Sequence, residues 1–101
     1  MTDKPMSQII EDAHELLDKG RWVQNRYTDR MGGYCELGAL GTVMGIDVQR
    51  DAPFVRAQGL MNELKRDLPE GHHWIPDFND HPDTTKEMVL DHLMTTAKRL
   101  R

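Results

Sequence analysis

The chain has little of what several classes of protein require. It contains one cysteine, so no internal disulfide can form, which fits a reducing compartment such as the cytoplasm. No apolar run approaches the roughly 18 residues that a membrane-spanning helix needs. The polar start, residues 1–5, lacks the apolar region of a signal peptide. We therefore expect a cytoplasmic protein with no membrane partner.

Positive charge is also in short supply. The 101 residues include 17 acidic and 13 basic side chains, a formal net charge of −4 at pH 7. This balance removes the attraction on which most nucleic-acid-binding proteins depend, and so argues against a nucleic-acid partner. Hydrophobic residues make up only 38% of the chain. Length and composition together predict one domain, residues 1–101, with a small core.

Apolar side chains recur at helical spacing in four segments. We expect helices over residues 4–19, 35–44, 51–68 and 84–100. Asp51 is the expected cap of the third helix, and residues 84–87 (Thr-Thr-Lys-Glu) form the capping box of the fourth. The two remaining segments, residues 21–34 and 70–83, are expected to be loops. The fold class is therefore all-α, a small four-helix domain with an ordered loop or a short hairpin between helices one and two.

The segment from Gly32 to Gly41 carries the strongest packing signal. Small and apolar residues dominate it, which is typical of a short buried helix. Gly38 and Gly41 each weaken a helix by roughly 1 kcal/mol relative to Ala, so their presence indicates the close approach of another element. The side chains expected to be buried here are Cys35, Leu37, Ala39, Leu40 and Val43, in contact with Ile9, Ala13, Leu17, Leu93 and Ala97.

Cys35 is the one candidate catalytic residue. A thiol at a helix N-terminus can have a lowered pKa, because the free N–H groups favour the thiolate. A nearby histidine as base and Asn79 or Asp80 as orienting group would complete a nucleophilic system, with His72, His73 and His81 available. The alternative is a small buried residue packed under Trp22. We favour this alternative because no sheet is predicted, so the sequence leans away from an enzyme.

The histidines give no metal signal. No His-x-x-x-His or Cys-x-x-Cys spacing occurs, so we expect neither a metal nor a cofactor. We interpret the loop histidines at 72, 73 and 81 as ordinary solvated residues, and His92 follows on the expected last helix.

Five aromatic residues lie outside the predicted helices: Trp22, Tyr27, Tyr34, Trp74 and Phe78. Aromatic side chains in loops either complete a small core or form a pocket for a partner. We favour the core, and expect Asn79 and Asp80 to form an Asx-type turn into the last helix. If the aromatic residues instead leave an open patch beside Arg26 and Asp80, that patch is the binding site. The candidate binding residues are therefore Trp22, Arg26, Tyr34, Trp74 and Asp80.

Motifs spread along most of the chain resemble those of a known family. They are Gly20-Arg21-Trp22, the stretch Gly32-Gly33-Tyr34-Cys35-Glu36-Leu37-Gly38-Ala39-Leu40, Phe78-Asn79-Asp80, and the Thr-capped last helix. This Trp…Cys-x-x-Gly-Ala-Leu…Asn-Asp pattern is similar to that of small, uncharacterised actinobacterial and actinobacteriophage proteins, a domain of unknown function. The resemblance implies a small intracellular, phage-encoded protein and carries no activity.

Three functions follow as hypotheses. The first is a protein-binding module whose partner is a host protein or a second copy of the chain. The second is a Cys35-dependent hydrolase or transferase. The third, a nucleic-acid-associated regulator, is disfavoured by the net charge.

Overall fold

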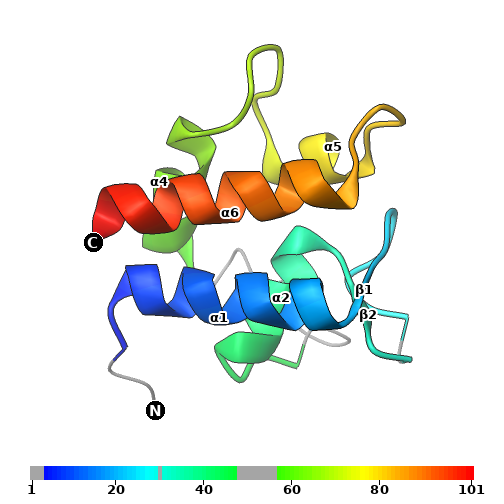
Figure 1. Ribbon diagram of the computed structural model, residues 1–101, viewed down its shortest axis with the longest axis horizontal. Coiled ribbons are helices and arrows are strands. Elements are labelled where there is room, and N and C mark those ends of the chain that lie inside the picture. The colour runs from blue at the N-terminus through cyan, green and yellow to red at the C-terminus, as the bar shows by residue number, and fades with distance from the viewer. Residues whose placement is uncertain (1–3, 30, 48–56) are drawn as a thin grey trace.

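The structure, a computed structural model, describes residues 4–29, 31–47 and 57–101. Helices dominate this part of the chain, which confirms the helical fold class (Figure 1). The described elements are α1 (Met6–Lys19), β1 (Arg21–Trp22), β2 (Gly33–Tyr34), α2 (Glu36–Val43), α4 (Gln58–Arg66), α5 (Ile75–Asp80) and α6 (Lys86–Leu100). None of these helices has the length and apolar character that crossing a membrane requires.

The four-helix prediction is wrong in one respect, because a further helix, α5, forms inside the segment expected to be a loop. Ile75 and Phe78 bury their side chains completely, and Pro76 is compatible with the first turn of a helix. Part of the expected third helix, residues 51–68, is observed as α4. Its expected cap, Asp51, lies outside the described residues.

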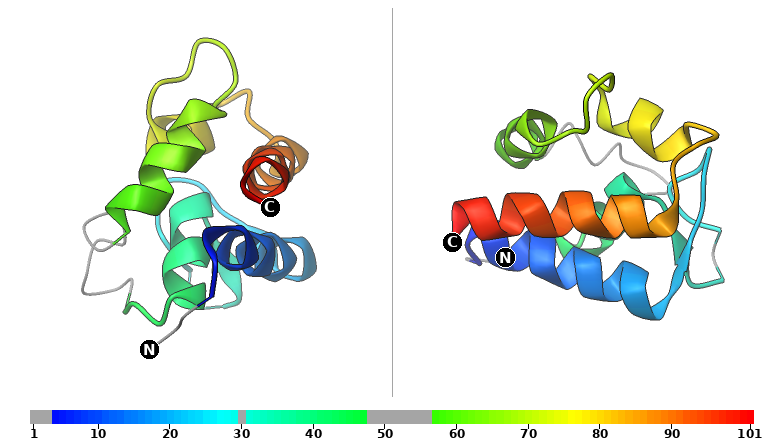
Figure 2. Two further views of the ribbon diagram at one scale, coloured as in Figure 1. Left: turned by 90° about the vertical axis from the view of Figure 1, so that its left-hand side faces the viewer. Right: turned by 45° about the horizontal axis from the view of Figure 1, so that its top comes forward.

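The two longest helices, α1 and α6, lie side by side and run in opposite directions (Figures 1 and 2). Each turns one apolar face inward, and the faces follow the predicted periodicity. The buried residues of α1 are Ile9, Ile10, Ala13 and Leu17, and the buried apolar residues of α6 are Val89, Leu93 and Ala97. Helix α2 packs against α1, α5 against α2 and α4 against α6, so all five described helices contribute to one core.

Helix α2 is buried along most of its length. Cys35, Leu37, Ala39 and Leu40 are buried as predicted, and they share the core with the expected residues of α1 and α6. Val43, which was also expected to be buried, is partly exposed. Glu36, a charged residue, is also fully buried in the first turn of the helix.

Of the two forms expected after α1, an ordered loop or a short hairpin, the structure has the ordered loop. Strands β1 and β2 pair in parallel, with Arg21 opposite Gly33 and Trp22 opposite Tyr34. The intervening loop therefore brings the chain back in its original direction. The carboxylate of Asp29 stabilises this return, because it accepts hydrogen bonds from the backbone N–H groups of Met31 and Gly33, each at 2.8 Å, and pairs with Arg21.

Gly38 permits a close approach, as its place in a buried helix predicted. An ideal Cβ at this position would lie 1.8 Å from the carbonyl oxygen of Tyr27, so no other residue fits without movement of the backbone. The same carbonyl accepts a hydrogen bond from the N–H of Cys35 at 3.1 Å. The approaching element at Gly38 is thus the loop that contains Tyr27.

The turn into the last helix also differs from the prediction. Asn79 and Asp80 belong to α5 and direct their side chains to distant parts of the chain, so they do not form a local Asx turn. Thr85, and not Thr84, caps α6, since its hydroxyl accepts the N–H of Met88 at 3.3 Å.

Candidate functional site

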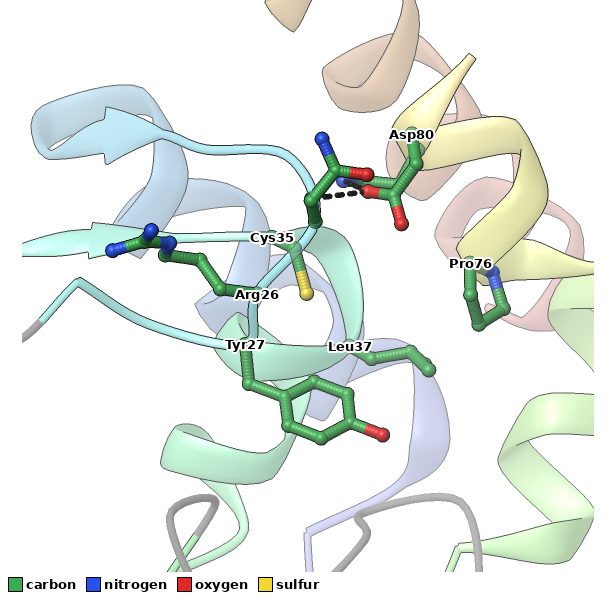
Figure 3. A pocket seen from close by; sticks show the side chains of 8 residues that line it. Arg26, Tyr27, Cys35, Leu37, Pro76 and Asp80 are labelled. Carbon is green, nitrogen blue, oxygen red and sulfur yellow. Dashed lines mark hydrogen bonds between the residues drawn. The ribbon is translucent and has the colours of Figure 1, made fainter.

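A pocket of about 240 Å³ opens between the loop after β1, the start of α2 and α5 (Figure 3). Three segments far apart in the sequence line it: Asn25, Arg26 and Tyr27 from the loop, Cys35 and Leu37 from α2 and its cap, and Pro76, Asn79 and Asp80 from α5. We call this the Cys35 pocket, and we call residues 23–29 the pocket loop.

Asn79 fastens the pocket loop to α5. Its Oδ1 accepts hydrogen bonds from the indole Nε1 of Trp22 at 2.7 Å and from the backbone N–H of Glu36 at 3.0 Å. Its Nδ2 donates to the carbonyl of Val23 at 3.1 Å and to Oδ1 of Asp80 at 2.9 Å. The amide, only 1% exposed, thereby uses its full capacity of two acceptances and two donations.

Two further contacts hold the same loop. The side-chain amide of Gln24 donates to the carbonyls of Asn79 and His81, at 3.0 and 2.9 Å. The backbone N–H of Asn25 donates to Oδ1 of Asp80 at 2.7 Å. Asn25 has a φ of +65°, in the left-handed region that asparagine tolerates better than most residues. The wall of the pocket is therefore built by specific contacts between the pocket loop and α5.

The thiol of Cys35 faces this pocket in an environment that suppresses its ionisation. Burial raises the pKa of the thiol to about 11, against a smaller opposing effect of the backbone N–H groups of Gly38 and Leu37. The negative charges of Asp80 and Glu36 raise the pKa further. The lowered pKa expected from the helix N-terminus is thus overturned, because desolvation outweighs the N–H groups.

The histidines proposed as a base for Cys35 are elsewhere. No histidine is among the described residues that line the pocket. His72 packs its ring against Phe78 and His81, with centroids 5.1 and 5.3 Å apart. The structure therefore brings Cys35 together with Asn79 and Asp80, but without the third member of a nucleophilic system.

We expect iodoacetamide to label Cys35 in the native protein, at about pH 7.5, at least about 100-fold more slowly than a cysteine in an unfolded peptide. The reason is that only the thiolate reacts, and a pKa of about 11 leaves little of it. Mass spectrometry of timed samples measures the rate, with the protein in guanidinium chloride as the control. Rapid labelling of the folded protein would contradict the suppressed thiol and restore the nucleophile hypothesis.

The candidate binding residues divide into two groups. Arg26 and Asp80 line the Cys35 pocket, whereas Trp22, Tyr34 and Trp74 do not. Trp22 supports the pocket indirectly through Asn79, and Tyr34 packs partly buried against the core. The ring of Trp74 lies under the ammonium of Lys65, 5.2 Å from its centroid.

Four residues of the pocket had no place among the candidates: Asn25, Tyr27, Leu37 and Pro76.

A second polar feature lies inside the core. Nδ1 of His92 is 2.6 Å from Oε2 of Glu36, and both side chains are 0% exposed. Nε2 of His92 is 2.7 Å from the carbonyl oxygen of Leu64, which can only accept, so Nε2 carries a hydrogen. His92 is therefore a buried residue of α6, unlike the loop histidines that precede it in the chain. Its partners come from α2 and α4, which the sequence could not place beside it.

The protonation of His92 follows from these partners. Burial lowers its pKa, but the charge and hydrogen bonding of Glu36, together with the Leu64 carbonyl and the charge of Asp67, outweigh burial and raise the pKa above the ordinary value. Glu36 and His92 therefore form a buried ion pair. Oε1 of Glu36 has no hydrogen-bond partner among the described residues.

Within residues 4–29, 31–47 and 57–101, no three His, Cys, Asp or Glu side chains converge as a metal site requires. The ionisable groups of the site can thus provide hydrogen bonds and charge to a ligand. Among the described residues they do not form a cluster that could hold a metal ion.

Comparison with known families matches residues 1–99 to the family of unknown function DUF6197, and the chain belongs to that family. The comparisons with curated proteins and with solved structures returned no match.

Proposed function

We propose that this member of the DUF6197 family is a protein-binding module, and that the Cys35 pocket receives one side chain of its partner. The observation that carries the proposal is the preformed pocket itself. Its walls are held by hydrogen bonds that Asn79 donates and Asp80 accepts, so binding does not require the loop to be ordered first.

The size and lining of the pocket support a side chain as the occupant. About 240 Å³ is less than the roughly 300–1,000 Å³ of pockets that hold drug-sized ligands and cofactors. Leu37, Pro76 and the ring of Tyr27 supply apolar surface, and the charged groups of Arg26 and Asp80 stand at its edge. An apolar pocket surrounded by polar groups is the usual setting of an anchor residue at an interface.

The partner proposed first is a host protein in the cytoplasm, which the resemblance to actinobacterial and phage proteins favours. A second copy of the chain is the alternative. The raised pKa of Cys35 gives no support to a hydrolase or transferase, and the net charge of −4 gives none to a nucleic-acid regulator.

Filling the pocket is expected to abolish partner binding. Pro76→Trp adds a large ring at the edge of the pocket, and Thr95→Trp adds the same ring on the exposed side of α6 as a matched control. A partner captured from an actinobacterial lysate by the wild-type protein is identified, purified and titrated by calorimetry. We expect the Kd to rise at least about tenfold for Pro76→Trp and to stay unchanged for Thr95→Trp. Equal binding by all three proteins would contradict the proposal.

A further inference from the structure

The carboxylate of Asp80 is held in one orientation and retains a vacant acceptor. Its Oδ1 accepts from the backbone N–H of Asn25 at 2.7 Å and from Nδ2 of Asn79 at 2.9 Å. No described residue bonds to the other oxygen, Oδ2. Since Asp80 lines the Cys35 pocket and is only partly exposed, an unpaired negative charge stands at the wall of the cavity.

The other charge of the lining does not neutralise it. Arg26 is exposed, and Figure 3 shows its guanidinium extending away from the side of the pocket where Asp80 and Pro76 lie. The pKa of Cys35 agrees, because Asp80 and Glu36 contribute to raising it. The interior of the pocket is therefore electronegative and favours a cation.

The remaining lining favours a cation with an apolar stem. Tyr27, Leu37 and Pro76 surround the centre of the pocket with an aromatic ring and aliphatic groups. Aliphatic stems of charged side chains pack well on such surface while the charged end finds a polar partner. The face of an aromatic ring also attracts a cation.

The vacant acceptor distinguishes between the two cationic side chains. Arginine makes its strongest pairs by donating in parallel to both oxygens of a carboxylate. Oδ1 of Asp80 is already engaged twice, so only Oδ2 is available. A lysine ammonium, which acts as a compact charge, needs one such oxygen.

We infer that the Cys35 pocket binds a lysine side chain of a protein partner, with the ammonium on Oδ2 of Asp80 and the aliphatic stem against Tyr27, Leu37 and Pro76. This inference rests on the proposed function, because it names the side chain by which a partner is recognised.

NMR titration of the folded protein tests the inference. The probe is Nα-acetyl-lysine N-methylamide, and its Nε-acetylated form is the uncharged control. We expect the charged probe to shift the backbone amide signals of Asn25, Leu37 and Asn79 at millimolar concentrations, and the acetylated form to bind at least about tenfold more weakly. Equal binding of the two probes to the wild-type protein, or no shift of the signals of these residues, would by itself overturn the inference.

Two matched variants test whether the negative charge of Asp80 is the one that binds the lysine probe. Asp80→Asn keeps an oxygen for Asn25 and Asn79 but removes the negative charge, and Asp91→Asn removes the same charge from the exposed side of α6. We expect at least about tenfold weaker binding for Asp80→Asn and unchanged binding for Asp91→Asn. The corresponding arginine and glutamate derivatives complete the series. Tighter binding of either one than of the lysine probe would overturn the assignment of lysine.

The experiments with the lysine probe and with the partner distinguish a wrong assignment of lysine from a wrong proposed function. If the lysine probe does not bind but a partner is lost on Pro76→Trp, the pocket binds protein and only the assignment of lysine is wrong. If the lysine probe binds at the pocket but the partner is insensitive to Pro76→Trp, the proposed function fails.

Discussion

His92→Leu is expected to lower the free energy of unfolding by about 3–5 kcal/mol, because it leaves the carboxylate of Glu36 buried without its partner. Both side chains of the pair are 0% exposed, so water cannot replace the lost contact. A loss of this size is a large fraction of the roughly 5–15 kcal/mol that holds a domain folded. Urea unfolding followed by circular dichroism measures it.

The double variant Glu36→Met/His92→Leu is the control. It removes both charges and keeps comparable apolar volume, so it leaves only the carbonyl of Leu64 without its donor. We expect it to recover most of the stability lost in His92→Leu, as buried ion pairs replaced by apolar residues often do. With Glu36→Met measured as well, a double variant as unstable as the sum of the two single variants would show that the two side chains do not stabilise each other.

The pH dependence distinguishes the ion pair from simple packing. The pKa of His92 is raised in the folded protein, so its contribution to stability is complete below the ordinary value, near 6.5, and is lost as the pH rises through the raised value. The groups that face the ring are Glu36 from α2, the Leu64 carbonyl from α4, Asp67 directly after α4, and Phe78 from α5. The melting temperature of the wild type is expected to fall over this range of rising pH, and the double variant is expected to lack that component.

Asn79→Ala is expected to cost about 3 kcal/mol or more, since it removes the partner of four groups at once. The indole of Trp22, the N–H of Glu36 and the carbonyl of Val23 each lose a hydrogen bond, and Asp80 loses a donor. A buried polar group left without a partner costs about 1–3 kcal/mol, and the losses around one residue do not simply add. Differential scanning calorimetry measures the change.

Asn79→Asp is the matched variant. A carboxylate can still accept from Trp22 and Glu36, but it cannot donate to Val23 and it repels Asp80. We expect a loss of stability at neutral pH that is partly reversed in mild acid, where protonation supplies a donor. If Asn79→Asp is as stable as the wild type at neutral pH, the two donated hydrogen bonds are not important to the fold.

The elements that were predicted correctly are those whose own sequence pattern is enough to identify them. Helices α1 and α6 have apolar side chains in regular helical spacing over 14 and 15 residues, so their buried faces could be recognised without knowledge of their partners. Helix α5 has six residues and Pro76 in its first turn, and a segment this short is not stable alone. It forms because Phe78 enters the core and Asn79 binds the pocket loop, neither of which local propensity reveals.

Two residues of the candidate pocket could be named from the sequence. Arg26 and Asp80 were proposed as charged residues near aromatic loops, and both line the pocket, while their role in binding stays a prediction. The favoured role of the aromatic residues was the core, and Phe78 is buried there while the other four pack against it. Trp22 also supports the pocket from behind through Asn79. The left-handed backbone of Asn25 and the pairing of Glu36 with His92 depend on contacts between distant segments. No pattern within either segment indicates them.

The close packing of the Tyr27 carbonyl against Gly38 links the pocket loop to the stability of the domain. Helix α2 has eight residues, too few to persist in isolation, and its first turn is completed by the bond from the N–H of Cys35 to that same carbonyl. The pocket loop and the most buried helix of the core therefore depend on each other for these contacts. A partner that occupies the Cys35 pocket binds a feature that exists only in the fully assembled domain, so its binding energy opposes global unfolding and not merely the fraying of a loop.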